Sequence, residues 1–290
     1  MADFLARSEA PLTDEEWGQI DQIVTTVAKR LLVGRRFLDL FGPLGAGLQD
    51  LDYNVFHPQG AAMLSLLGNE ELSLVQPVRR MHQQLPMIYK DFALFWRDIE
   101  SAHRLGIALD TGSAAAAAAF VAQKEDDLLF NGDPSFDIAG LLTVDGALAI
   151  DTGDWTEAGS AFRAVAAAVQ MLMSHGLYAP YAVIVNPVAY AQLQRVYATS
   201  GVLEIQHVRE LVQDGVYQTQ AIRAMPGVVV SLGPQNFDLA IAQDIITGFL
   251  GPEGLNLPFR VFETLVLRIK RPEAICLLRG PAPDPAKLGV

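Results

Sequence analysis

An amphipathic helix followed at once by a glycine-broken segment constrains this chain most, and together they occupy residues 11–47. Thr13 is placed to cap the helix, and the three acidic residues after it fill the positive first turn. Apolar residues then recur at three- and four-residue steps: Trp17, Ile20, Val24, Val27 and Leu31. This stripe must lie on the rest of the subunit, on a neighbouring chain or on a guest peptide. The stretch holds no catalytic grouping, so we interpret it as an assembly signal.

The composition of the chain favours contacts between subunits over binding to nucleic acid. A length of 290 residues allows a sizeable core in one or two domains, and an apolar share of 51% is high for a monomer. The excess of apolar residues indicates surface that other subunits cover. The formal net charge of -12 argues against a partner with a phosphate backbone, because affinity for nucleic acid depends mainly on Lys and Arg.

The chain shows no sign of export or of membrane insertion. Its one cysteine, Cys276, lies in an apolar run and cannot form an intrachain disulfide, so we expect a buried thiol. The first eleven residues lack the apolar core of a signal peptide, and no run reaches the roughly 18 apolar residues that span a bilayer. We therefore expect a cytoplasmic protein with no membrane partner.

The pattern of elements along the chain predicts a mixture of helices and strands. Residues after the break at Gly42–Gly47 favour an extended hairpin arm, because short apolar runs alternate there with Asn, Gly and Pro. Helices are predicted at Trp96–Leu105, Thr111–Phe130, Ala161–Ser174, Pro187–Tyr197 and Val208–Gln213. Strands are predicted at Tyr181–Asn186, Gly227–Leu232, Leu239–Gln243, Phe259–Lys270 and Ala274–Leu278. The alternation after Asn131 indicates an α/β unit.

Two Glu-x-x-His pairs, Glu100 with His103 and Glu204 with His207, have the spacing of ligands in di-iron carboxylate bundles. Such a site also needs two further glutamates from two further long helices, whereas the strands after Asn131 point away from a helix bundle. We favour surface or interface roles for these pairs. A small α/β metal-dependent enzyme remains the alternative hypothesis.

The other polar groupings do not form a recognisable catalytic motif. Glu125, Asp126 and Asp127 are adjacent, so their side chains point in different directions on a helix, and we expect a solvated or interfacial patch. The glycines of Gly42–Gly47 lack the endings of phosphate-binding loops. The chain also contains no G-x-S-x-G, H-E-x-x-H or paired cysteine motif. We predict neither a catalytic residue nor a bound metal or cofactor.

Several strings in a fixed order carry a resemblance to a known family. They are F-L-A-R near the start, A-P-L-T-D-E-E-W, G-R-R-F-L-D and G-P-L-G-A-G, followed by residues 85–100, 123–132, 176–186 and 258–278. The chain resembles the encapsulins, bacterial shell proteins related to the HK97 phage capsid. It looks closest to the myxobacterial type through I-Y-K-D-F, F-W-R-D-I-E, G-V-L-E-I and D-G-V-Y-Q.

The resemblance implies an α+β, HK97-like capsid fold with an N-terminal helix, an E-loop, a P-domain and an A-domain. Strands near Asp52–Phe56 and Glu71–Val75 would be the legs of the E-loop, and the helix with the alanine run Ala114–Ala119 would be the P-domain spine. The implied boundaries are 1–47 for the N-terminal arm and helix, 48–80 for the E-loop, 81–132 for the P-domain, 133–250 for the A-domain, 251–280 for P-domain return strands and 281–290 for a flexible tail.

The resemblance also implies a function. The chain would be a structural subunit, not an enzyme, that assembles with copies of itself into an icosahedral nanocompartment. The shell would enclose a ferritin-like iron-oxidising protein or a dye-decolourising peroxidase, held through a short C-terminal targeting peptide. The implied cargo-binding residues are Leu31, Leu32, Arg35, Phe37 and Asp39. The implied pore residues are Thr199, Ser200, Gly201 and Val202.

Overall fold

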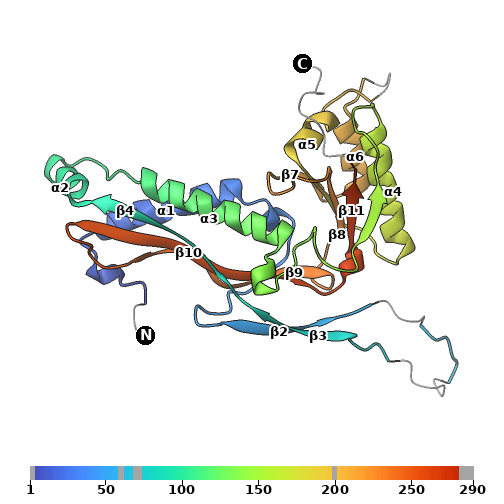
Figure 1. Ribbon diagram of the computed structural model, residues 1–290, viewed down its shortest axis with the longest axis horizontal. Helices are drawn as coiled ribbons and strands as arrows, with labels where there is room; N and C mark the ends of the chain where they lie inside the picture. The colour runs from blue at the N-terminus through green and yellow to red at the C-terminus, as the bar shows by residue number, and fades with distance from the viewer. Residues whose placement is uncertain (1–3, 58–61, 68–73, 198–200, 281–290) are drawn as a thin grey trace.

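A computed structural model describes residues 4–57, 62–67, 74–197 and 201–280 of the chain. The molecule has three parts: an elongated layered unit, an upright unit at one end of it, and a hairpin arm beneath (Figure 1). The arm is one continuous stretch of sequence, whereas the chain passes between the other two parts more than once.

The elongated unit is a four-stranded sheet covered on one face by two long helices (Figure 1). The strand order is β1 (Leu40–Phe41), β9 (Phe237–Phe249), β10 (Asn256–Ile269) and β4 (Met87–Phe95). β10 runs antiparallel to both of its neighbours, whereas the short β1 runs parallel to β9. The covering helices are α1 (Asp14–Leu31) and α3 (Gly112–Asn131), and α2 (Trp96–Leu105) lies beyond them at the far end.

The apolar stripe of α1 packs on its own subunit, which decides among the three places that the sequence left open. Trp17, Ile20 and Val24 are buried in the main core, and the Trp17 ring meets the Phe259 ring of β10 edge to face. Thr13 and Glu16 form a capping box at the start of the helix, as the residue types there predict. The alanines of α3 allow close approach, since Ala114, Ala117 and Ala118 are at most 2% exposed.

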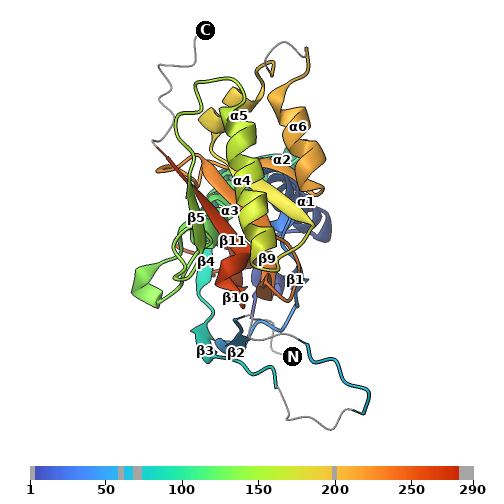
Figure 2. The same cartoon turned by 90° about the vertical axis from the view of Figure 1, so that its right-hand side faces the viewer.

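The upright unit is a five-stranded sheet with helices packed against it (Figure 2). Its strand order is β5 (Leu148–Asp151), β11 (Ile275–Arg279), β8 (Gly227–Ser231), β6 (Tyr181–Val185) and β7 (Gly215–Gln218). Every residue of β6 and β8 is buried, as the continuous apolar runs of these strands require. The helices are α4 (Ser160–Ser174), α5 (Pro187–Leu193) and α6 (Glu204–Val212).

Two predictions in this region are wrong. The strand predicted at 274–278 does not complete the sheet of 259–270; it is β11, which pairs with β5 and β8. The short 3-10 turn Pro272–Ala274 redirects the chain between the two sheets. The helix predicted to reach Tyr197 ends at Leu193, because the Arg195 side chain turns back to the Gln192 carbonyl and the Arg195 carbonyl accepts from the Glu204 amide.

The arm begins with β2 (Asp50–Val55) and returns through β3 (Arg79–Gln84), which pair antiparallel. The second leg was predicted too early: residues 71–73 of Glu71–Val75 lie outside the described residues, and Leu74 and Val75 belong to no strand. β3 has few apolar residues and is joined to β2 by charge, since both Arg80 and His82 pair with Asp52. The apolar run before it therefore resembled a strand more than the true strand did.

The remaining described elements are short. Four 3-10 turns are η1 (Arg7–Glu9), η2 (Gly34–Arg36), η3 (Pro134–Phe136) and η4 (Pro272–Ala274). Cys276 is fully buried, as expected for a structural thiol. Among the described residues, no helix combines the length and apolar character needed to cross a bilayer.

Candidate functional site

The turn after α1 is fixed to α3 by a buried carboxylate. The backbone amides of Val33 and Gly34 donate to Asp126 at 3.0 to 3.1 Å. A side chain at position 34 would bring its Cβ within 2.4 Å of Leu129 Cδ1, so glycine lets η2 lie directly on the helix. The G-R-R turn is thus a rigid support for the residues that follow it.

Arg35 joins this turn to three carboxylates on three other elements. Its Nε donates to Glu125 Oε1 of α3 at 2.9 Å. Its Nη2 donates to Glu263 Oε2 of β10 at 2.6 Å, and its Nη1 to Asp244 Oδ1 of β9 at 2.6 Å. The Glu125 and Glu263 side chains are fully buried, whereas Asp244 is 62% exposed. We call these four residues the Arg35 cluster.

Two of the surrounding carboxyl groups have pKa values shifted upwards. Burial, followed by the neighbouring Glu125 charge, raises the pKa of Glu263 well above its usual value. Burial also raises the pKa of Asp126 to about 6, although the Gly34 and Val33 amides act in the opposite direction. The predicted solvated or interfacial patch is therefore wrong for Glu125 and Asp126, which are buried inside the subunit and at most 7% exposed. Only the next residue, Asp127, reaches solvent, and it pairs with Lys124.

Asp126 should make the unfolding free energy of the subunit depend on pH. Its pKa of about 6 in the folded chain lies above the ordinary value of 3.8. The stabilising contribution of Asp126 is therefore complete below pH 3.8 and is lost as the pH rises through 6. We expect the unfolding free energy to fall by about 3 kcal/mol over this window. Asp126→Asn should flatten this part of the curve in thermal unfolding scans, and Asp127→Asn should not. The same curve for both variants would contradict the assignment.

Two grooves flank the aromatic contact between Phe37 and Tyr217, whose ring centroids lie 5.5 Å apart. The Leu31 groove has a volume of about 520 Å³ and runs between the end of α1 and β7. Its lining includes Arg30, Leu31, Arg36, Tyr190, Tyr217 and Arg223. The Asp39 groove also has a volume of about 520 Å³ and lies between the turn and the upright unit. Its lining includes Phe37, Asp39, Tyr178, Asp214, Gln235 and Arg271.

The five implied cargo-binding residues do not lie together: three line one or the other of the two grooves, and the other two lie outside both grooves. Phe37 and Asp39 meet in the Asp39 groove, and Leu31, 36% exposed, lies in the other groove. Leu32 faces inward and packs against Ala28 and Ala122, while Arg35 is taken up by its cluster.

Sequence reasoning gave no docking role to most residues that line these grooves, and Tyr217 and Asp214 are two of them. The Tyr217 hydroxyl donates to Asp214 Oδ2 at 2.8 Å, and the pair stands between the grooves. No helical or strand spacing relates them to Phe37, which lies far earlier in the chain. The string D-G-V-Y-Q, which contains both residues, was the only signal, and it carried a resemblance without a role.

The implied pore segment lies at the start of α6, and Thr199 and Ser200 lie outside the described residues. Gly201 has a positive φ of 72°, and the Val202 carbonyl accepts from the Tyr197 amide at 2.8 Å. A single antiparallel bridge between Val196 and Leu203 closes this turn. The segment therefore leaves and re-enters the upright unit at neighbouring points.

The two Glu-x-x-His pairs do not come together, because α2 and α6 lie at opposite ends of the molecule (Figure 1). His103 contacts Glu16 of α1 at 2.8 Å. Glu204 is fully buried and accepts the backbone amides of Gly159 and Phe162 at the start of α4. The described part of the chain contains no group of three His, Cys, Asp or Glu residues able to hold a metal ion.

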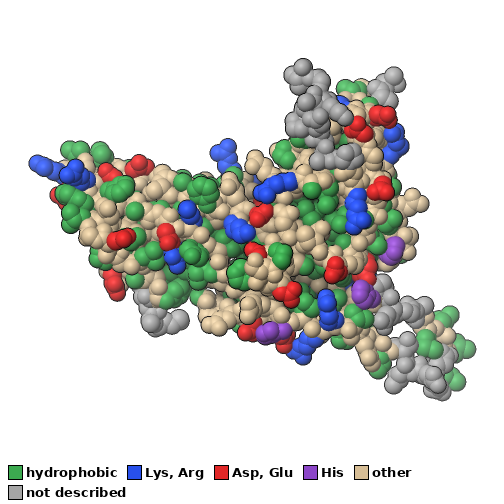
Figure 3. Space-filling model, viewed as in Figure 1, with side chains coloured by type: hydrophobic (Ala, Val, Ile, Leu, Met, Phe, Trp, Pro, Cys, Tyr) green, Lys and Arg blue, Asp and Glu red, His purple; other side chains and the backbone are tan. Residues whose placement is uncertain are grey.

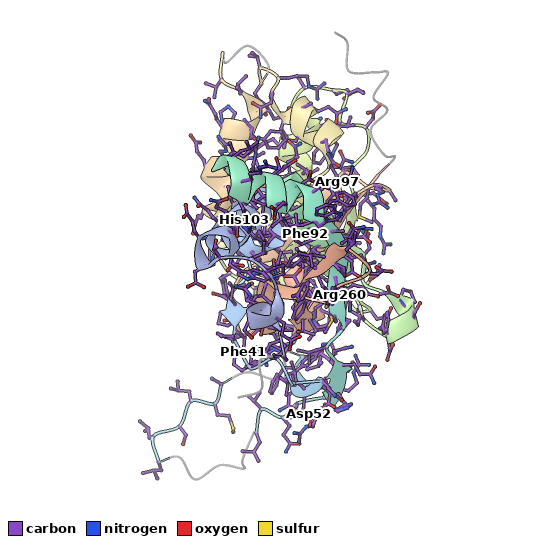
Figure 4. The ribbon with its side chains drawn as sticks, turned by 90° about the vertical axis from the view of Figure 1, so that its left-hand side faces the viewer. Phe41, Asp52, Phe92, Arg97, His103 and Arg260 are labelled. Atoms are coloured by element: carbon purple, nitrogen blue, oxygen red, sulfur yellow. The ribbon has the colours of Figure 1, made fainter. Side chains whose placement is uncertain are left out.

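The end of the elongated unit is seen in Figure 4, which labels residues from helix, sheet and arm. Arg97 and His103 lie at the level of the helices, and Asp52 lies on the arm below the sheet (Figure 4). The Arg260 guanidinium stacks on Tyr89 at 4.0 Å and pairs with Asp91, so the open face of the sheet carries organised charge. The labelled positions also show that Arg97 and His103 of α2 lie far from Asp52 of the arm (Figure 4).

Sequence comparisons place the whole chain among shell proteins. The family profile described as "Encapsulating protein for peroxidase" matches residues 2–266. The chain is 46% identical to the type 1 encapsulin shell protein EncA of Myxococcus xanthus, over 97% of this chain and 98% of that protein. It is 41% identical to a diheme-cytochrome-encapsulin shell fusion protein of Kuenenia stuttgartiensis, over 93% of this chain and 74% of that protein.

Structural comparisons confirm the expected HK97-like capsid fold. A virus-like particle from Pyrococcus furiosus matches with a TM-score of 0.75 and 20% identity, covering 91% of this chain and 100% of the other. The capsid of Myoviridae phage XM1 matches with a TM-score of 0.62 and 14% identity, covering 83% and 89%. At these identities the likeness concerns the fold.

Proposed function

The chain belongs to the encapsulin shell-protein family, and on that premise we propose that identical copies assemble into a closed icosahedral shell around a cargo enzyme. The family assignment makes the chain a structural shell subunit rather than an enzyme. A closed shell follows from one set of contacts repeated under symmetry, which sums modest interfaces into a stable particle.

The observation that carries this proposal is the hairpin arm. Six large apolar side chains in the described part of residues 62–75 are exposed, with values from 55% to 103%. They are Met63, Leu64, Leu66, Leu67, Leu74 and Val75. Figure 3 shows this apolar surface extending well clear of the rest of the subunit. A two-stranded arm of this kind is marginal alone and gains stability when another subunit covers it.

The base of the arm is bonded to the chain at and just before η4. The Phe56 amide donates to the Lys270 carbonyl at 2.9 Å, and the His57 ring contacts the Glu273 carboxylate next to it. These contacts direct the arm away from the subunit and leave its leucines free for a neighbour. We propose that this neighbour is a second copy of the chain.

We propose that cargo docks in the Asp39 and Leu31 grooves through a short C-terminal peptide. The Leu31 groove adjoins the end of α1, where Leu31 is exposed, and the Asp39 groove is lined by the exposed Asp39 and by the buried Phe37 ring. Leu32 lines neither groove. Many identical sites on one shell would retain an oligomeric cargo even when each peptide binds weakly.

The names of the family profile and of one relative support two candidate cargo proteins. The family profile names a peroxidase, and a relative from Pyrococcus furiosus, 27% identical over 70% of this chain and 55% of that protein, is a ferritin-like-encapsulin shell fusion protein. We propose a ferritin-like iron-oxidising protein as cargo, with a dye-decolourising peroxidase as the second candidate. We place the shell in the cytoplasm.

We further propose that small molecules enter through the segment Thr199–Val202. The hydrogen bond from the Tyr197 amide to the Val202 carbonyl holds the two ends of this segment together, which supports the proposal. Copies of such a loop around a symmetry axis would leave a narrow opening between them.

Assembly is tested on the purified chain without any cargo. We expect hollow particles of megadalton mass in negative-stain microscopy and sedimentation, because the arm and the fold belong to the subunit itself. Adding metal or substrate should leave the sedimentation unchanged. Monomers or dimers alone under mild buffer conditions would refute the proposal.

A further inference from the structure

Two fully buried carboxyl groups in the Arg35 cluster share one nitrogen atom. Arg35 Nη2 donates to Glu125 Oε2 at 2.7 Å and to Glu263 Oε2 at 2.6 Å. Neither glutamate exposes any of its side chain. Neither assembly through the arm nor docking in the grooves requires such a pair in the interior of the subunit.

The charges around this nitrogen do not balance when both glutamates are ionised. Arg35 supplies one positive charge and divides it further with Asp244, the charged group that β9 contributes. Asp126, the next residue on α3, adds a third carboxyl group nearby. Two buried negative charges beside one shared cation would carry a large desolvation penalty. One of the pair is therefore favoured in its neutral form.

The geometry selects Glu263 as the neutral member. Its second oxygen, Oε1, is buried and has no hydrogen-bond partner among the described residues, whereas both oxygens of Glu125 accept from Arg35. Glu263 also lies where the pairing of β10 with β9 shifts, between Phe262 and Thr264. A strand irregularity re-aims a side chain, and here the glutamate points towards the helices. The raised pKa of Glu263 agrees with this choice.

We propose that Glu125 and Glu263 together bind one proton, so that the Arg35 cluster is a proton-binding site joining the turn after α1 to α3 and β10. Loss of the proton at alkaline pH leaves an excess negative charge in the interior and loosens the packing of the turn on the sheet. This proposal concerns the subunit alone and holds whether or not cargo docks in the grooves.

Infrared spectroscopy of the assembled full chain tests for the proton directly. At neutral pH we expect the carbonyl stretch of a buried neutral carboxylic acid, which Glu263→Gln removes and the control Asp127→Asn keeps. Raising the pH should bleach the band in the wild type. In Glu125→Gln the bleaching midpoint should move to lower pH, because the neighbouring charge is gone. A wild type without the band, or a midpoint unchanged in Glu125→Gln, would overturn the shared proton.

Stability scans give a second readout. Because the pKa of Glu263 is raised in the folded chain, its stabilising effect is lost as pH rises through that folded value. Above about pH 7.5 the Asp126 carboxyl, with its pKa of about 6, is almost fully ionised, and comparing the wild type with Glu263→Gln cancels the groups that the two proteins share. The wild-type unfolding midpoint should fall more steeply than that of Glu263→Gln, by about 3 °C per pH unit. Parallel curves for the two proteins would overturn the proposal.

Discussion

Shells should fail to close when the arm is shortened. Replacing residues 58–76 with Asn-Gly keeps β2 and β3 and leaves a connection of six residues between their facing ends at Val55 and Arg79. The change removes Leu64, Leu66 and Leu67, which are 81% to 103% exposed. Covering three leucines on a neighbour stabilises a contact by about 5 to 9 kcal/mol. We therefore expect soluble subunits and no closed particles in size-exclusion chromatography and microscopy.

Two further variants distinguish the effect of the arm's length from the effect of its apolar side chains. Changing the three leucines to serine in an arm of full length should also prevent closure, whereas Ser65→Ala between them should not. Circular dichroism and the unfolding midpoint of the shortened chain should stay close to those of the wild type, because the described residues among those removed are not part of the core. Closed particles in the shortened chain would show that the shell is held by other surfaces.

Cargo loading should collapse when the charge at the Asp39 groove is reversed. Asp39 is exposed on the groove wall, and its backbone carbonyl accepts from the Leu239 amide, whereas its carboxylate forms no hydrogen bond to the described residues. Asp39→Lys should therefore leave the subunit folded while removing an acidic contact for the peptide. Loss of a charged hydrogen bond of about 1.5 to 3 kcal/mol weakens each site roughly 10- to 100-fold. A fluorescent reporter bearing the C-terminal segment of a candidate cargo should then be absent from purified shells.

The matched control is Asp145→Lys, which makes the same change on an exposed loop away from both grooves. It should load the reporter as the wild type does. Arg35→Ala is a poor test of docking, because it also leaves two buried glutamates without their partner. Equal loading of Asp39→Lys and Asp145→Lys shells would move the docking site elsewhere.

Local patterns predicted the elements that carry their own periodicity. The cap and stripe of α1 and the alanine run of α3 were readable because a helix places them on one face. Polar β3 was misplaced, because its pairing depends on Asp52 in another strand. The end of α5 was misplaced for a related reason: the contact that stops it is a carbonyl of Arg195 meeting an amide beyond the loop.

The candidate site was predicted less well than the fold, because its geometry depends on contacts across long separations in sequence. Arg35 was expected at a docking surface, yet its partners Glu125 and Glu263 come from α3 and β10. Burial of Glu125 and Asp126 could not be read from adjacency alone. The resemblance located the right segment, whereas the side chains that face inward became clear only from the packing.

Both sheets depend on strands made late in synthesis. β1 pairs with β9, with Leu40 opposite Leu239, and β5 pairs with β11, with Leu148 opposite Cys276. A ribosome adding roughly 5 to 20 residues per second therefore exposes the adhesive leucines of the arm well before either sheet can close. Pairings so distant along the chain also fold slowly. The apolar arm thus emerges before either large sheet of its own subunit has formed, so its leucines are exposed during synthesis.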